Sequence, residues 1–186
     1  MSGRRQLAVA LLVLAVVVAI FGAGRTLLRN ELSPVGVGAR APNFTALTLD
    51  SAAQKKTLED YRGRVVLINI WATWCKPCVV EMPSIERLYQ TYRDKGLSVV
   101  AVSVDDPGMA PQIRSFAERY GLTFDILHDP EGQQGRMSRD YQTTGYPETV
   151  IIGRDGIIRK KLLGAHDWSS KDNRELIERL LAESAE

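Results

Sequence analysis

The sequence predicts an α/β domain in which helices cover both faces of a mixed β-sheet. Apolar runs at residues 65–70 and 97–104 have the length and composition of buried strands. The helical segment between them favours a parallel pair joined by a right-handed crossover. The Asp155-Gly156 dipeptide between two later apolar runs is typical of an antiparallel hairpin. Parallel and antiparallel pairs in one sheet, with helices between strands, indicate a three-layer fold.

The first part of the domain is predicted to be an extension in front of this core. Residues 41–49 alternate loosely between apolar and polar side chains, as in one strand of an N-terminal hairpin. Residues 57–61 can form one helical turn before Gly63. The first core strand, residues 65–71, follows directly.

The helix after this strand is predicted from apolar residues at helical spacing, namely Val79, Met82, Ile85, Leu88 and Tyr92. Pro83 removes one backbone hydrogen bond, so we expect a kink in the helix axis. Gly96 is expected to end the helix, because glycine readily adopts the left-handed conformation found just beyond helix ends.

The later elements alternate in the same way. They are a helix from Pro111 that Gly121 stops, a strand at 123–127, a weaker helix at 133–141, strands at 149–152 and 157–163, and a last helix at 170–182. Ser170 is the expected N-cap of the last helix, which should bury Leu176, Ile177, Leu180 and Leu181.

Both cysteines of the chain, Cys75 and Cys78, lie where the first core strand turns into its helix. The start of a helix offers unpaired N–H groups and the positive end of the dipole, which favour the reactive thiolate. Two intervening residues place the second sulfur within reach of the first across one helical turn. We therefore predict a reversible dithiol/disulfide pair.

A structural zinc site and a purely structural disulfide are less favoured roles for the cysteine pair. A structural zinc site needs about four ligands. The chain offers two cysteines and two histidines, and His128 and His166 lie outside finger-like spacing. His128 is better placed to end a strand, and His166 to lie in a loop. A purely structural disulfide would close a loop too short to constrain the unfolded chain strongly.

The composition limits the classes of function. The net charge of +2 over 186 residues is too small to argue for nucleic-acid binding, and no basic stripe is visible. Two cysteines in a single motif do not form a disulfide scaffold. The cellular compartment must therefore be inferred from the N-terminus.

The N-terminal segment at residues 7–23 is almost wholly apolar and near the lower end of the about 17–25 residues that span a bilayer. Arg4 and Arg5 precede it, which favours a cytoplasmic N-terminus and an extracytoplasmic remainder. Arg25 and Arg29 follow it and weaken this charge asymmetry.

We expect residues 1–25 to form an uncleaved membrane anchor. A cleaved signal peptide is the alternative, although residues 21–25 are rich in small side chains without a clear cleavage motif. No cysteine directly follows the apolar run, so a lipoprotein anchor is not expected. Residues 26–36 are expected to be a tether, and residues 37–186 the globular domain.

These motifs together resemble a known family. Residues 71–78 (WATWCKPC), followed by Glu81, Pro83 and residues 145–149 (GYPET), are similar to membrane-anchored thioredoxin-like reductases of the TlpA and ResA type. The related CcmG proteins serve cytochrome c maturation. The resemblance extends from Val37 onward and implies a thioredoxin-like fold with an N-terminal hairpin extension.

The resemblance also implies roles for specific residues. Cys75 is expected to be the exposed nucleophile and Cys78 the resolving thiol, which breaks the mixed disulfide formed by Cys75. Pro147 matches a cis-proline that faces the cysteines in the family. The residue before it, Tyr146, would then offer backbone groups to a partner strand. The alternative is that Pro147 only begins an edge strand.

The sequence offers more than one acid that could tune Cys78. Cytosolic thioredoxins carry a buried acid at the position of Asn69, which cannot take a proton. ResA-type proteins place an acid after the second core strand, and Asp106 is the nearest match, with Asp105 beside it. Such a carboxylate could accept the thiol proton or raise the thiol pKa. The same residues are equally consistent with a solvated turn.

The remaining candidate site residues surround the motif. Glu81 either tunes the thiols or complements the helix dipole. Glu148 resembles the CcmG pattern more than that of ResA. Lys76 and Pro77 lie between the cysteines, where the lysine charge favours a thiolate. Trp74 is expected to pack beside the dithiol or to shape a docking face, whereas Trp71 is expected in the core.

The resulting functional hypothesis is a membrane-tethered thiol:disulfide oxidoreductase that acts outside the cytoplasm. It is expected to use only the Cys75–Cys78 disulfide, with no other cofactor or metal, and to reduce protein disulfides such as those of cytochrome c precursors. A reductant in an oxidising compartment needs electrons from a membrane dithiol carrier. The alternatives are a disulfide-forming oxidant, a copper-handling thioredoxin-fold module and, less favoured, a thiol peroxidase.

Overall fold

The computed structural model describes residues 6, 7, 9, 11–19 and 35–183. Its contacts separate two units, Met1–Pro34 and Val35–Glu186. The described residues of the first unit are helical. Within the described part of the chain, no helix has the length and apolar character needed to cross a membrane. Much of the predicted anchor, and the predicted tether up to residue 34, lie outside the described residues.

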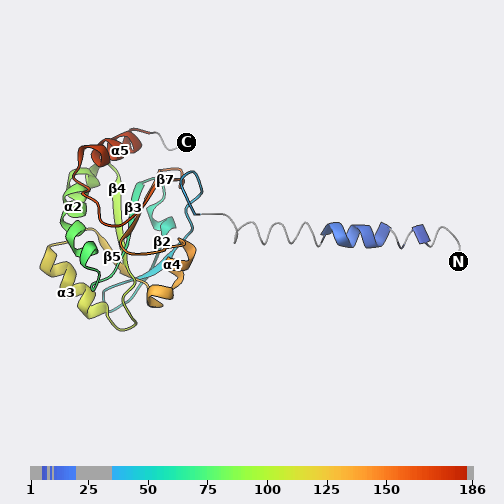
Figure 1. Cartoon of the computed structure of the whole chain (residues 1–186), viewed down its shortest axis with the longest axis horizontal. Helices are drawn as coiled ribbons and strands as arrows, with labels where there is room; N and C mark the ends of the chain where they lie inside the picture. Colours follow the sequence, from blue (N-terminus) through green and yellow to red (C-terminus); the bar gives the residue numbers. More distant parts are fainter. Residues whose placement is uncertain (1–5, 8, 10, 20–34, 184–186) are drawn as a thin grey trace. The chain divides into compact units, whose positions relative to one another are not determined.

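The second unit is built on a seven-stranded mixed sheet with strand order β2-β1-β5-β4-β3-β6-β7 (Figure 1). Its strands are β1 (Thr45–Thr48), β2 (Lys55–Thr57), β3 (Val65–Trp71), β4 (Leu97–Ser103), β5 (Asp125–His128), β6 (Glu148–Ile152) and β7 (Ile158–Leu163). The central strands β3, β4 and β5 are parallel, and the others pair antiparallel. The predicted mixed sheet and N-terminal hairpin are confirmed.

Helices cover both faces of this sheet. The helix α2 (Lys76–Tyr92) lies beside α5 (Lys171–Ala182), where the Tyr92 hydroxyl donates to Glu178. The helix α3 (Ala110–Tyr120) shares that face, with Phe116 packed 4.7 Å from Trp71 between ring centroids. The short helix α4 (Arg136–Asp140) lies on the opposite side (Figure 1). This arrangement is the three-layer architecture expected from the sequence.

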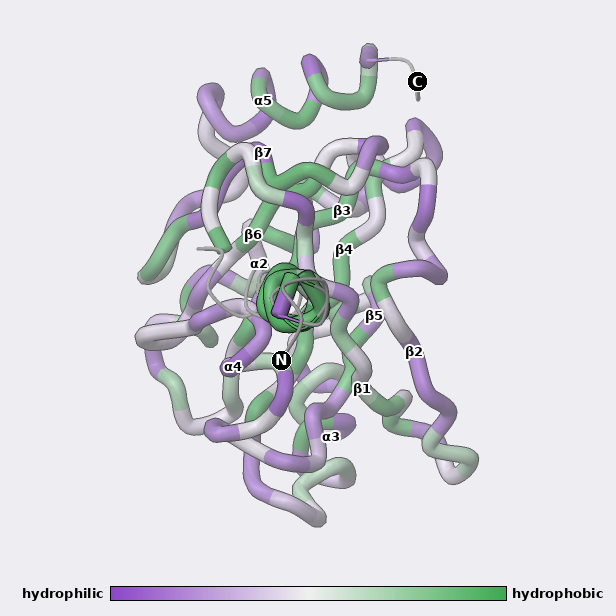
Figure 2. Tube along the Cα trace, turned by 90° about the vertical axis from the view of Figure 1, so that its right-hand side faces the viewer, coloured by the Kyte–Doolittle hydropathy of each residue, from purple (hydrophilic) through white to green (hydrophobic). Residues whose placement is uncertain are grey.

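The core lies along β3 and β4, in which every residue is buried. Burial on both faces explains why these strands read as continuous apolar runs rather than as alternating patterns. In Figure 2, β2 at the sheet edge is largely hydrophilic, whereas α5 alternates between hydrophobic and hydrophilic residues. Trp71 is fully buried, which confirms its predicted place in the core.

Most predicted helix boundaries are confirmed. A 3-10 turn forms at Leu58–Tyr61, and Gly121 ends α3 in the left-handed conformation. The helix α2 continues through Pro83 to Tyr92, and a further 3-10 turn then leads to Gly96, whose φ is 106°. The predicted stop at Gly96 is therefore confirmed, with a tighter last turn than expected.

The predicted helix at 133–141 was wrong in its extent. It is divided into a 3-10 turn at Gly132–Gln134 and α4, because Gly135 is extended. The Asp129 carboxylate accepts a hydrogen bond from the Met137 N–H at 2.8 Å, and a Cβ at Gly135 would clash with one of its oxygens. The Asp129 carboxylate thus occupies the space that a side chain at position 135 would need, and α4 begins only at Arg136.

Two further departures are small. The predicted strand at 123–127 is shifted to Asp125–His128, so that His128 ends it as expected. In α5, Ile177 and Leu180 are buried as predicted, whereas Leu176 and Leu181 are only partly buried.

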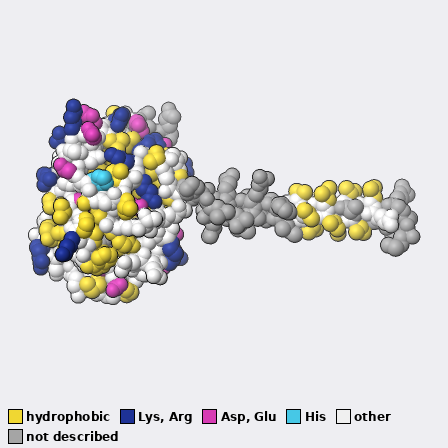
Figure 3. All heavy atoms as spheres, viewed as in Figure 1, with side chains coloured by type: hydrophobic (Ala, Val, Ile, Leu, Met, Phe, Trp, Pro, Cys, Tyr) yellow, Lys and Arg dark blue, Asp and Glu magenta, His cyan; other side chains and the backbone are white. Residues whose placement is uncertain are grey.

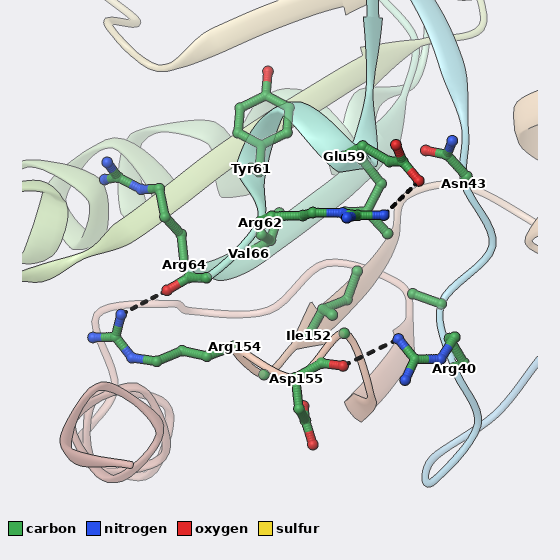
Figure 4. Close-up of a pocket in the computed structure, with 15 residues that line it drawn as sticks. Arg40, Asn43, Glu59, Tyr61, Arg62, Arg64, Val66, Ile152, Arg154 and Asp155 are labelled. Atoms are coloured by element: carbon green, nitrogen blue, oxygen red, sulfur yellow. Dashed lines mark hydrogen bonds and ion pairs between the residues drawn. The ribbon is translucent and has the colours of Figure 1, made fainter. Parts of the chain in front are cut away.

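A cavity of about 590 Å³ lies at the N-terminal end of β3. Val66 and Ile152 contribute apolar surface, and arginine side chains surround them (Figure 4). Arg40 donates to the Asp155 carbonyl, and Arg62 pairs with Glu59. The strand β3 runs from this cavity to Trp71, so the cavity and the cysteine motif lie at opposite ends of the strand.

Candidate active site

The cysteine motif forms the junction between β3 and α2. Cys75 and Cys78 are joined by a disulfide, with their Cα atoms 5.3 Å apart. Cys75 is the N-cap of α2, and its Sγ accepts a hydrogen bond from the Cys78 N–H at 3.3 Å. Lys76 and Pro77 form the first turn, where proline costs no helical hydrogen bond. The predicted spacing therefore brings the two sulfurs into bonding contact.

The burial of the two cysteines differs from the expectation of an exposed nucleophile. Cys75 is 5% exposed and Cys78 is fully buried. Because Cys75 caps the helix, its side chain turns toward the Cys78 N–H rather than out to solvent. Cys75 is nevertheless the cysteine that keeps accessible surface, and Lys76 and Pro77 beside it are exposed. A partner can therefore approach Cys75 and not Cys78.

The segment around Pro147 lies beside this motif. The Tyr146–Pro147 peptide bond is cis, as the resemblance implied. The Tyr146 ring meets the Trp74 ring edge-on, with centroids 6.0 Å apart. The Tyr146 hydroxyl is within hydrogen-bond distance of the Ser138 hydroxyl at 2.8 Å, which ties it to α4. Two loops far apart in sequence thus meet at the dithiol.

The surface beside the dithiol exposes apolar side chains. Trp74 is 53% exposed, and Val80 and Leu163 are also exposed. Figure 3 shows hydrophobic side chains gathered on the part of the domain that α2 and α3 cover. Leu163 packs close to Gly145, just before the cis-proline segment. An exposed tryptophan on such a surface is typical of a protein-docking face.

Glu81 is buried one turn after Cys78 on the same face of α2. Its Oε1 accepts from the Asn69 side-chain amide at 2.7 Å. Its Oε2 accepts from the His166 backbone N–H at 3.1 Å and from the Trp168 indole at 3.2 Å. Burial raises the pKa of Glu81, and these hydrogen bonds oppose that rise. The carboxyl group can therefore hold a proton more readily than an exposed glutamate.

Asn69, in turn, links Glu81 to the cis-proline segment. Its amide nitrogen also lies 2.9 Å from the Thr149 hydroxyl, two residues after Pro147. Asn69 therefore connects the buried acid Glu81 to the strand that follows Pro147.

Glu148 lies on the opposite face of the sheet from Glu81. Successive residues of a strand alternate between faces, and its neighbour Thr149 points toward Asn69. The Glu148 carboxylate is 3.5 Å from the Lys161 ammonium, which also donates to the Tyr141 carbonyl. Burial raises the pKa of Glu148, and the Lys161 charge opposes the rise. No described contact joins Glu148 to either cysteine.

The structure distinguishes the two acids that follow β4. Asp106 is exposed, and no described interaction links it to a cysteine, so the solvated turn describes it better. Asp105 is buried and accepts from the Thr73 N–H at 2.9 Å and the Thr73 hydroxyl at 2.6 Å. It also accepts from the Ser103 hydroxyl at 2.6 Å. Asp105 therefore anchors the loop that leads into Cys75.

Trp168 was not predicted as a site residue, His166 was expected only as a loop residue, and Asp105 was considered only as the neighbour of Asp106. Trp168 and His166 lie more than eighty residues from Glu81, and no local pattern pairs them with it. The signal for Glu81 itself was available, because it falls on the apolar face of α2 between Cys78 and Ile85. An acid on a buried helical face needs buried donors.

Comparison with known proteins identifies the fold and chemistry. Residues 37–161 match the AhpC/TSA family. The chain is 44% identical over 123 residues to the thioredoxin-like protein YneN of Bacillus subtilis, covering 66% of this chain and 68% of that protein. It is 38% identical over 135 residues to the thiol-disulfide oxidoreductase ResA of Geobacillus thermodenitrificans, covering 73% and 74% respectively.

A solved structure agrees with this relationship. The crystal structure of a putative thiol:disulfide interchange protein DsbE from Chlorobium tepidum has a TM-score of 0.69 and 27% identity, and covers 78% of this chain and 98% of that one. Both it and the ResA protein are named for thiol:disulfide chemistry, and this chain holds a Cys75–Cys78 disulfide at the start of α2. The chain therefore belongs to the AhpC/TSA family of thioredoxin-like proteins, and it is a thiol:disulfide oxidoreductase of the TlpA/ResA type.

Proposed function

We propose that this chain reduces protein disulfides outside the cytoplasm, from a membrane-anchored position. The observation that carries the proposal is the asymmetry of the dithiol. Cys75 keeps accessible surface at the start of α2, whereas Cys78 is sealed beneath it beside a buried acid. This arrangement separates a thiol that meets the substrate from one that resolves the intermediate.

The reaction is a two-step exchange. In the reduced protein, the Cys75 thiolate attacks one sulfur of a substrate disulfide and releases the other as a thiolate, which forms a mixed disulfide. The Cys78 thiolate then attacks Cys75 and releases the second substrate sulfur. The substrate gains two electrons, and the protein ends with the Cys75–Cys78 bond that the structure contains.

Glu81 is proposed to take the proton that Cys78 must lose before its attack. The two residues share the buried face of α2, and burial raises the pKa of Glu81 toward the range in which it accepts a proton. Trp74, Tyr146 and the cis-proline segment are proposed to receive the substrate chain, because Trp74 directly precedes the accessible cysteine and its ring meets that of Tyr146.

The location and partners are proposed from the N-terminus and from the chemistry. Residues 1–25 would hold the domain at the membrane, with the dithiol on the periplasmic or extracellular side. A reductase in that compartment must be recharged, so its donor would be a membrane protein that carries a dithiol. Cytochrome c precursors with oxidised haem-binding thiols are the proposed substrates.

Trapping tests the proposed roles of the cysteines. A Cys78→Ser variant lacks the resolving thiol and should accumulate mixed disulfides through Cys75 in membranes of the native organism. Mass spectrometry of these adducts identifies the partners, and apocytochrome c peptides are expected among them. Cys75→Ser is the matched control and should trap nothing. Adducts formed by Cys75→Ser alone would reverse the assignment.

The reduction potential tests the direction of electron flow. A reductase should have a potential nearer to about −270 mV, as in thioredoxin, than to about −120 mV, as in a strong oxidant. Equilibration of the full-length protein with glutathione redox buffers measures the value. A reduction potential near that of the strong oxidant would contradict the proposal and would indicate that the protein forms disulfides instead.

A further inference from the structure

The groups that donate hydrogen bonds to Glu81 offer its proton no route to solvent. The side chain is only 2% exposed, and Cys78 beside it on α2 is fully buried. Its three donors are the Asn69 amide, the His166 backbone N–H and the Trp168 indole. None of these groups exchanges protons near neutral pH, so they hold the carboxylate but cannot carry its proton away.

A route is needed if Glu81 acts as proposed above, and the inference rests on that role. Each turnover of the dithiol would deliver one proton from Cys78 to Glu81. The carboxyl group must release this proton before the next cycle. A buried acid therefore needs an ionisable neighbour that also reaches solvent.

His166 is the ionisable residue in the loop that binds Glu81 and is itself partly exposed. His166 follows β7 in the loop whose backbone N–H binds Glu81, and the residue as a whole is only partly buried. Its ring Nε2 is enclosed, and no protein group in the described part of the chain bonds it. The ring meets the Trp168 ring at 6.2 Å between centroids, and the Trp168 indole N–H reaches the same carboxylate oxygen. A buried nitrogen without a partner requires an explanation.

The other charged groups around Glu81 are engaged elsewhere or lie at the surface. On α2, β7 and the loop after it they include Lys76, exposed at the start of α2, Arg87, which donates to Ser169, Lys160, which donates to Asn173, Glu86, which accepts from Thr123, and Asp167, which accepts from the Ser169 N–H. On α5, Glu178 accepts from the Tyr92 hydroxyl. The nearby strand residues Asn69 and Thr149 do not ionise near neutral pH. The Glu148–Lys161 pair lies across the sheet.

We propose that the His166 imidazole carries the proton between Glu81 and solvent. The His166 ring moves into hydrogen-bond reach of the protonated carboxyl group, takes its proton as a neutral imidazole, and then releases it to water as the imidazolium. The carboxylate is restored and no electrons move. Histidine suits this step because its two nitrogens gain and lose protons near physiological pH. His166 is thus a positioning and relay residue that does not touch the reacting sulfurs.

Stopped-flow reaction of the reduced full-length protein with dithiobis(nitrobenzoate) tests the relay. The first coloured thiolate released reports attack by Cys75, and the second reports resolution by Cys78. His166→Gln should slow only the second phase, by about tenfold in weak buffer, less than the roughly hundredfold cost of losing a direct acid–base group. An unchanged second phase would overturn the proposal.

Chemical rescue distinguishes a relay from a structural role. In His166→Ala, added free imidazole should restore the second phase in proportion to its concentration, and it should leave the wild-type rate unchanged. Equal stimulation of both proteins, or none, contradicts a relay. Asp167→Asn is the matched control from the same loop and should behave as wild type. Thermal unfolding of each variant checks that the fold is retained.

A double-mutant cycle separates this inference from the proposed function. If Glu81 accepts the proton, Glu81→Gln slows the second phase, and adding His166→Gln slows it no further. A slow Glu81→Gln with a normal His166→Gln removes the relay but leaves the acid role intact. A normal Glu81→Gln removes the acid role, and the relay falls with it.

Discussion

Glu81 and Glu148 are both buried glutamates close to the dithiol segments, yet the protein compensates their charges differently. Glu148 faces the Lys161 ammonium at 3.5 Å, so its negative charge has a cation beside it. Glu81 has three neutral donors for hydrogen bonds. Neutral donors favour the carboxylate without balancing its charge, whereas a cation favours the carboxylate and also balances its charge; burial raises the pKa of both glutamates. The first arrangement suits proton exchange, and the second suits structure.

The largest expected effect comes from removing the cation on the Glu148 side. Lys161→Met leaves a carboxylate that is 5% exposed without its partner, and it also removes the donor to the Tyr141 carbonyl. We expect a loss of about 3 kcal/mol in the free energy of unfolding, near the lower end for breaking a buried ion pair. Urea denaturation at neutral pH measures it. A loss below about 0.5 kcal/mol would place the pair with weak surface ion pairs.

Asp105 extends the comparison to a third buried acid. Its carboxylate is held by the Thr73 N–H and by the Thr73 and Ser103 hydroxyls. Asp105→Asn retains one acceptor oxygen but places an amide donor against these donors. We expect the free energy of unfolding to fall by about 2 kcal/mol, because buried donors that lose a charged acceptor are left unsatisfied. The midpoint of denaturant unfolding measures it, and a midpoint equal to wild type would contradict the anchor role.

The buried acids also show how much of the fold and of the site can be predicted from the sequence. The strands β3 and β4 and the dithiol at the start of α2 follow from local patterns, because runs of buried residues and helix capping are properties of neighbouring residues. Glu81, His166 and Trp168 meet only after β7 folds back on α2, and no spacing in the chain encodes that contact. The resemblance indicated Asp106 with Asp105 beside it, and adjacent acids cannot be distinguished until the backbone assigns one of them to the interior.

The pH dependence of stability should show an effect of Glu81, the acid with three neutral donors, that is smaller than the two effects above. Burial raises the pKa of Glu81 above its ordinary value of 4.5, so the folded protein binds this proton more tightly than the unfolded chain. The associated stability is fully present below that value and is lost as the pH rises through the folded pKa. The unfolding free energy of wild type should therefore fall relative to Glu81→Gln over this window.

Chemical denaturation of the oxidised protein across the acidic to neutral range measures this difference. Oxidised protein is used so that the cysteines do not titrate. The hydrogen bonds from Asn69 and Trp168 oppose the effect of burial, which is why the change should be smaller than for Lys161→Met. A difference that does not vary with pH would show that Glu81 does not titrate differently in the folded and unfolded states.

Asp106→Asn should have the smallest effect, and it extends the comparison to an exposed acid. Asp106 is exposed next to buried Asp105, and the described part of the chain gives its side chain neither an ion-pair partner nor enclosed donors. Surface substitutions of this kind change the unfolding free energy by less than about 0.5 kcal/mol. The pH profile of thiol reactivity, measured by alkylation of Cys75 and Cys78, should also match wild type. A shifted profile would restore Asp106 as a tuning acid and would mean that charge acts on the dithiol through solvent, without the burial that distinguishes Glu81.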